Sequence, residues 1–143
     1  MNQSIQDAIQ GLSFQYENCT RETLPDLLRF YAPNATFKDP FQEVVGHAKI
    51  EEVFIKMFDQ LNNPKFVIVQ TLMGDQQASL LWEFQFSMKR WNTKPQKFLG
   101  VSWLYFDANH QIKKHIDYWD PASGIYEQLP LLGPVLRFIK KKA

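Results

Sequence analysis

The sequence predicts an α+β fold in which three helices are followed by a sheet of hairpin-linked strands. Apolar side chains recur with helical spacing up to residue 61, and with a period of two from residue 65 onward. Turn-forming residues at 74–75 and 107–109 separate the later segments, as in β-hairpins. A run of helices followed by a run of strands is typical of helices packed on one face of a curved sheet.

The helical part divides into three amphipathic segments. Ser4 with Asp7, and Thr23 with Asp26, have the spacing of helix N-terminal caps. The third segment follows Gly46, and the run 62–64 (NNP) is expected to stop it. The buried positions predicted for the three helices are Ile5, Ala8, Ile9, Leu12 and Tyr16; Leu24, Leu27, Leu28 and Tyr31; and Ile50, Val53, Phe54, Met57, Phe58 and Leu61.

Four later segments have strand character, and one short segment precedes the third helix. The predicted strands cover 65–73, 80–89, 98–106 and 111–119, and 41–46 is expected to be a connection. We expect one domain spanning 1–143, because the chain shows no linker and no repeat. Residues 121–143 form an apolar and then basic extension after Pro121.

Composition narrows the classes of function. The net charge of +1 gives no general case for nucleic-acid binding. Cys19 is the single cysteine, which suits a cytoplasmic protein, and no signal peptide is visible. His47, His110 and His115 are scattered without the spacing of metal ligands, so no metal site is predicted.

The most informative stretch contains an acidic residue at the end of a short extended segment. Ala35, Phe37 and Asp39 alternate with polar residues and therefore share one face, which is expected to point inward. Pro40 favours extended geometry at Asp39 and closes the strand. Burying a carboxylate costs free energy unless it has a hydrogen-bond or charge partner, so a carboxylate without one indicates a functional role. Asp39 is therefore either a catalytic base or the cap of the turn before Phe41.

Residues 31–41, YAPNATFKDPF, resemble the Y-A-x-x-A-T-x-x-D-P-F run of bacterial ketosteroid isomerases. Those enzymes belong to the nuclear transport factor 2-like superfamily, which includes the SnoaL-like cyclases, and the order of elements along the whole chain is also similar. The resemblance implies a cone-shaped fold that encloses an apolar pocket, a homodimer formed by the exposed sheet face, and Asp39 as the general base. It identifies the fold better than the reaction.

The predicted last strand carries a second polar group. His115, Asp117 and Trp119 alternate and therefore share one face. Asp117 stands where the isomerases have a small apolar residue, and it could fix the tautomer of His115. The alternative is a hydrogen-bonded pair that only braces the sheet.

The two oxyanion donors of the isomerases are a tyrosine on the first helix and a protonated aspartate on the penultimate strand. Tyr16 resembles the first, although it could equally be a core residue with its hydroxyl at the rim. Ser102 occupies the position of the second, so the chain departs from the isomerase pattern there. This departure disfavours steroid isomerisation and leaves other proton-transfer, cyclisation or hydration chemistry open.

The predicted function is acid–base catalysis, without a cofactor, on a hydrophobic carbonyl or polycyclic compound. The alternative is a non-catalytic ligand-binding or dimeric assembly module of the same fold. The aromatic stripes either wall such a pocket or only fill the core. The expected wall residues are Phe54, Met57, Phe58, Trp82, Phe84, Phe86 and Trp119.

The apolar and basic tail, 129–143, has three interpretations. The one favoured is packing against the domain or a second subunit, because the apolar run is long. The others are contact with a membrane surface, which its composition allows, and a lid over the pocket.

Overall fold

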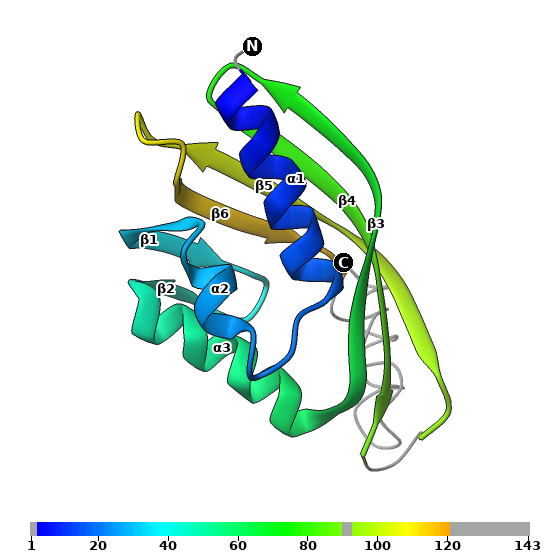
Figure 1. Ribbon diagram of the computed structural model, residues 1–143. Helices are drawn as coiled ribbons and strands as arrows, with labels where there is room; N and C mark the ends of the chain where they lie inside the picture. The colour runs from blue at the N-terminus through cyan, green and yellow to red at the C-terminus, as the bar shows by residue number, and fades with distance from the viewer. Residues whose placement is uncertain (1–2, 90–92, 121–143) are drawn as a thin grey trace, which may run out of the picture.

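The computed structural model of the chain describes residues 3–89 and 93–120. Within these ranges three helices and a six-stranded sheet form the predicted α+β fold (Figure 1). None of the helices there is long and apolar enough to cross a membrane. The elements are α1 (Gln3–Glu17), α2 (Leu24–Leu28), β1 (Tyr31–Lys38), β2 (Glu43–Val45), α3 (His47–Gln60), β3 (Leu61–Gly74), β4 (Gln77–Met88), β5 (Gln96–Phe106) and β6 (Ile112–Tyr118).

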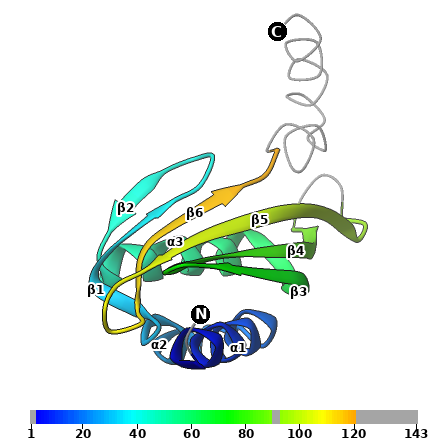
Figure 2. The ribbon, with the colours of Figure 1, turned by 90° about the horizontal axis from the view of Figure 1, so that it is seen from above.

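The sheet is mixed and strongly curved (Figure 2). Its strand order is β2-β1-β6-β5-β4-β3, and of its five strand pairs only β1 with β6 is parallel. The parallel register places Phe37 opposite His115 and Lys38 opposite Ile116. Asp39 follows Lys38 directly, so it leaves β1 at the level of Asp117 on β6. Two segments that are far apart in the sequence thus bring their acidic residues to the same end of neighbouring strands.

The period of two in β4 divides the sheet into an inner and an outer face. Every second residue of β4, from Ala78 to Met88, is buried against the helices. The indole of Trp82 lies over Gly100 of β5, where a Cβ atom would come within 2.2 Å of the ring. Gly100 therefore makes room for the largest side chain on the inner face.

Several local predictions were wrong. Residues 43–45 pair with β1 as the edge strand β2, which is too short to show a period in the sequence. Leu61 is the first residue of β3 rather than the last of α3, and β3 continues through 62–64 because its pairing with β4 outweighs the turn preference. Asn63 adopts a positive φ of 50° there, which asparagine tolerates.

Tyr31 was assigned to the stripe of the second helix, but it opens β1 and is fully buried. The side chain of Thr23 does not cap α2; its hydroxyl accepts the N–H of Thr20 instead. The extension 121–143 and its three interpretations lie outside the described residues, as do 90–92.

Candidate functional site

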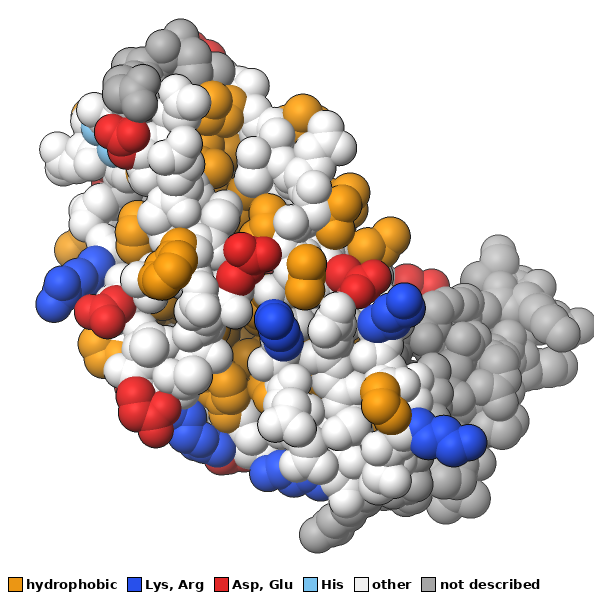
Figure 3. Space-filling model, turned by 45° about the vertical axis from the view of Figure 1, so that its right-hand side comes forward, with side chains coloured by type: hydrophobic (Ala, Val, Ile, Leu, Met, Phe, Trp, Pro, Cys, Tyr) orange, Lys and Arg blue, Asp and Glu red, His pale blue; other side chains and the backbone are white. Residues whose placement is uncertain are grey.

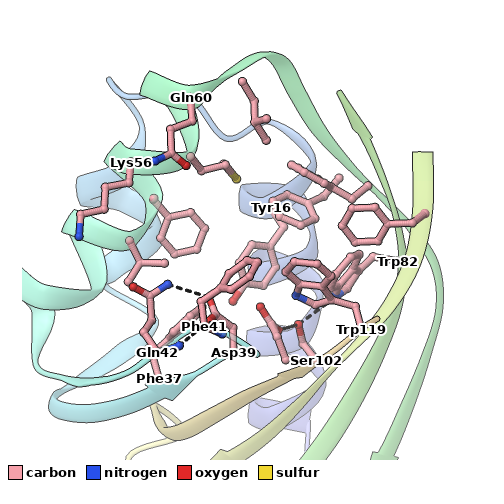
Figure 4. A pocket seen from close by; sticks show the side chains of 18 of the residues that line it. Tyr16, Phe37, Asp39, Phe41, Gln42, Lys56, Gln60, Trp82, Ser102 and Trp119 are labelled. Carbon is pink, nitrogen blue, oxygen red and sulfur yellow. Dashed lines mark hydrogen bonds between the residues drawn. The ribbon is translucent and has the colours of Figure 1, made fainter. Parts of the chain in front are cut away.

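A cavity of about 840 Å³ lies between the inner face of the sheet, α1 and α3 (Figure 4). Its size is that of a pocket for a drug-sized molecule. Aromatic rings from β1, α3, β3, β4 and β5 form most of its walls. These ring residues are Phe37, Phe54, Phe66, Trp82, Phe84 and Phe98.

A chain of hydrogen bonds joins six side chains along one side of this cavity. His115 is at its centre and only 2% exposed. Its Nδ1 lies 2.8 Å from the Tyr31 hydroxyl and 3.2 Å from the Tyr16 hydroxyl, and the two hydroxyls also contact each other. Its Nε2 lies 2.6 Å from Oδ1 of Asp117. Three elements, α1, β1 and β6, therefore meet at one imidazole ring.

The chain continues from Asp117 to β5 and β4. The Ser102 hydroxyl donates to Asp117 Oδ1 at 2.5 Å and accepts the indole N–H of Trp82 at 2.9 Å. Because an indole can only donate and a carboxylate can only accept, the direction of both bonds is fixed. Ser102 thus holds Asp117 in place, and it stands where the isomerases carry an acidic donor.

The two tyrosines at the other end of the chain are neutral donors. Burial, followed by contact with each other, raises the pKa of Tyr16 well above its ordinary value. Burial also raises the pKa of Tyr31. Both hydroxyls therefore keep their protons at neutral pH. With Nε2–H of His115 donating to the Asp117 carboxylate, Nδ1 accepts a hydrogen bond from a tyrosine hydroxyl.

Asp117 presents one free oxygen to the cavity. Its Oδ1 accepts from both Ser102 and His115, whereas no residue in the described part of the chain hydrogen-bonds its Oδ2. The side chain is 15% exposed and lines the cavity. Oδ2 is therefore available to a bound molecule.

Asp39 also lines the cavity, but its carboxylate is occupied. Oδ1 accepts the backbone N–H groups of Phe41 at 2.8 Å and of Gln42 at 3.0 Å, and Oδ2 accepts the Gln42 side-chain amide at 3.0 Å (Figure 4). These bonds fit the second interpretation of the sequence, in which Asp39 caps the turn before Phe41.

Most of the expected wall residues line the cavity, namely Phe54, Met57, Trp82, Phe84 and Trp119. Two do not. Phe58 lies one position beyond Met57 on α3, and its ring packs under the Arg21 guanidinium, 5.9 Å away. Phe86 is buried deeper along β4, against the rings of Phe84 and Phe98.

Sequence reasoning missed Tyr31 as a site residue. Its helical spacing after Leu24, Leu27 and Leu28 concealed its place at the start of β1. The sequence did contain a sign of its role, because Tyr31 is the first residue of the YAPNATFKDPF run in which Asp39 was identified as a candidate. Phe41 and Phe98 were also missed as cavity residues; each lies in a segment whose geometry depends on pairing between distant strands.

The family model described as a SnoaL-like domain matches residues 15–115, which is more than half of the chain. The chain belongs to the SnoaL-like domain family. The matched range contains five of the six hydrogen-bonded side chains and ends two residues before the sixth, Asp117.

Solved structures agree with this SnoaL-like fold. A ketosteroid isomerase-like protein from Catenulispora acidiphila, in complex with trimethylamine, is 13% identical with a TM-score of 0.73, covering 86% of this chain and 93% of that one. A candidate polyketide cyclase from Xanthomonas campestris is 12% identical with a TM-score of 0.70, covering 85% and 93%. TerC, co-crystallised with polyporic acid, is 12% identical with a TM-score of 0.71, covering 84% and 94%.

These likenesses establish the nuclear transport factor 2-like fold of this SnoaL-like domain, with its three helices and mixed sheet. At such identities they say nothing of its reaction. The comparison with curated proteins finds no match.

Proposed function

We propose that the protein is an acid–base enzyme that moves a proton on a hydrophobic, carbonyl-bearing compound bound in the cavity. The observation that carries this proposal is Asp117, a residue that lines the aromatic cavity, whose Oδ1 is held by Ser102 and His115 while its Oδ2 has no hydrogen-bond partner among the described residues. A positioned carboxylate of this kind can take a proton from a carbon next to a carbonyl group.

In the proposed reaction, Asp117 Oδ2 accepts a proton from the α-carbon of the substrate. The electron pair of the broken C–H bond forms a C=C bond, and the carbonyl oxygen becomes an enolate oxygen. The proton then returns from Asp117 to another carbon or to the same one. The His115 imidazole shares Asp117 Oδ1 and keeps the carboxylate in position throughout.

Tyr16 is suited to stabilise the enolate oxygen. Its hydroxyl lines the cavity and stands at the opposite end of the imidazole from Asp117. When Tyr31 donates to Nδ1 of His115 at 2.8 Å, its oxygen accepts from the Tyr16 hydroxyl, so we propose that Tyr16 turns its proton from Tyr31 to a substrate oxygen when the substrate binds. A neutral donor aimed at developing negative charge lowers the barrier.

The walls favour a flat, apolar substrate, because rings of Phe37, Phe54, Phe66, Trp82 and Phe84 surround the cavity. Relatives support a small-molecule ligand. One bears the description of a candidate polyketide cyclase, and TerC was crystallised with polyporic acid. We therefore propose a polycyclic or polyketide-like ketone as the substrate class.

The test uses 2-tetralone, a bicyclic aromatic ketone with an acidic α-carbon. We expect the wild-type protein to accelerate exchange of its α-protons for deuterons in heavy water, followed by proton NMR, above the rate with heat-denatured protein. Exchange at the same rate with native and denatured protein would contradict the proposal. A compound that binds without exchange would instead favour the non-catalytic ligand-binding module.

We further propose that the outer face of the sheet pairs two copies of the chain. Leu99, Trp103 and Tyr118 are 58%, 39% and 57% exposed on this face, and the pairing of β5 with β6 sets them side by side. Elsewhere, as on the face in Figure 3, hydrophobic side chains are interspersed with charged ones.

We expect Trp103→Lys to shift the protein from dimer to monomer in sedimentation equilibrium, because it places a charge within the apolar contact. Phe14→Lys is the matched control, since Phe14 is 62% exposed on α1, away from that face. A wild-type monomer, or an equal effect of both substitutions, would contradict the proposed interface.

A further inference from the structure

The turn between β1 and β2, residues 39–42, carries the exposed end of an aromatic wall of the cavity. The Phe41 ring packs edge-on against Trp119 with the centroids 5.3 Å apart. Trp119 in turn stacks on Phe98 at 4.9 Å. All three line the cavity, and Phe41 is 46% exposed at its edge. The wall is thus assembled from three separate segments and depends on the turn for its outer ring.

Asp39 determines the shape of this turn. Its side chain accepts the backbone N–H groups of Phe41 and Gln42, and its own N–H donates to the carbonyl of Gln42 at 2.9 Å. Pro40, between them, has no N–H to offer. The position of the Phe41 backbone is therefore set mainly by the Asp39 carboxylate.

We propose that Asp39 is a positioning residue that holds Phe41 against Trp119, and that it does not take the substrate proton. Three donors already occupy its carboxylate, and protonation would weaken the bonds that shape the turn. Asp117 has the opposite arrangement, with an oxygen left open to the cavity. The role of Asp39 in holding the ring contact does not depend on the proposed function. Only the expected effect on ligand binding rests on the proposed function.

Substitution by asparagine or alanine separates the two roles of Asp39. Asn retains the oxygen that accepts from Phe41 and Gln42 but is not a base, whereas Ala retains neither property. In the ligand-free protein we expect Asp39→Asn to keep the nuclear Overhauser contact between the Phe41 and Trp119 rings. We expect Asp39→Ala to lose this contact and to exchange the amide protons of Phe41 and Gln42 faster. Unchanged protection of the β4 amides in the same spectra verifies that each variant is folded.

The ligand measurement uses 2-naphthol, a flat analogue of the enol of 2-tetralone, titrated by fluorescence. We expect Asp39→Ala and Phe41→Ala each to weaken its binding about five- to tenfold, and Asn at position 39 to restore most of the affinity. We also expect 2-tetralone exchange to be slower in the Asp39→Ala protein than in the wild type, and close to the wild-type rate in the Asp39→Asn protein.

Two results would overturn the positioning role. One is an Asp39→Asn protein that keeps the ring contact but loses 2-tetralone exchange, which would make Asp39 the base. The other is an Asp39→Ala protein that keeps both the ring contact and the affinity. If the wild type does not bind 2-naphthol, the proposed function fails, and the ring contact and amide exchange still decide the role of Asp39.

Discussion

Asp117→Asn is expected to slow the exchange of 2-tetralone by about a hundred- to ten-thousand-fold, the usual contribution of a general acid–base group. Asparagine keeps the size of the side chain and can still accept from Ser102, but it cannot take up a proton at neutral pH. The amide oxygen of asparagine can also accept from His115, although more weakly than a carboxylate does. We therefore expect only a modest loss in the free energy of unfolding. The rate is measured by proton NMR in heavy water at saturating 2-tetralone.

The control is Asp75→Asn, the same chemical change in the exposed turn between β3 and β4. Its exchange rate should equal that of the wild type. An Asp117→Asn protein that is folded, binds 2-naphthol and still exchanges 2-tetralone at the wild-type rate would exclude Asp117 as the proton-transferring group.

Alkaline pH is expected to unfold the protein through its two buried tyrosines. Burial raises the pKa of both Tyr16 and Tyr31 in the fold, whereas in the unfolded chain tyrosine ionises near pH 10. The stability that they contribute is therefore fully present below about pH 10 and is lost as the pH rises above it. The two together should lower the free energy of unfolding by about 2.7 kcal/mol per pH unit there.

This slope is large compared with the total stability of about 5–15 kcal/mol that is typical of a domain. Urea unfolding of the wild type, Tyr16→Phe and Tyr31→Phe at a series of pH values measures it. Each substitution should reduce the slope above pH 10 by about half of that amount. Tyr105→Phe, on a half-buried ring that is not among the residues proposed for the dimer contact, is the control. Equal slopes in all four proteins would show that the buried hydroxyls do not couple to folding.

The fold was predictable because its signals are periodic. The alternation along β4 and the apolar stripe of α3 each show in the sequence which face is buried. The edge strand β2 and the start of β3 were not predictable, since both depend on pairing with strands that are distant in the sequence.

The sequence pointed to several of the residues that line the cavity, but it did not point to Tyr31 or to the hydrogen bonds that connect these residues. Alternation placed His115 and Asp117 on one face, and helical phase placed Tyr16 on the buried side of α1. Only the parallel pairing of β1 with β6 brings Tyr31 to His115, and no local pattern reveals a parallel partner. The hydrogen bonds of the two carboxylates arise only in the folded chain. They use Oδ1 of Asp117 and leave its Oδ2 without a partner in the described residues, and they occupy the carboxylate of Asp39.

The most direct test of the proposed chemistry is a crystal structure of the protein with 2-naphthol. We predict that the rings lie between the aromatic walls of the cavity, that the hydroxyl oxygen lies within hydrogen-bond distance of the Tyr16 hydroxyl, and that C1, which corresponds to the α-carbon of 2-tetralone, faces the Asp117 carboxylate. A ligand whose hydroxyl instead contacts Asp39, or a ligand bound outside the cavity, would contradict the assignment of Asp117 as the group that exchanges a proton with the substrate.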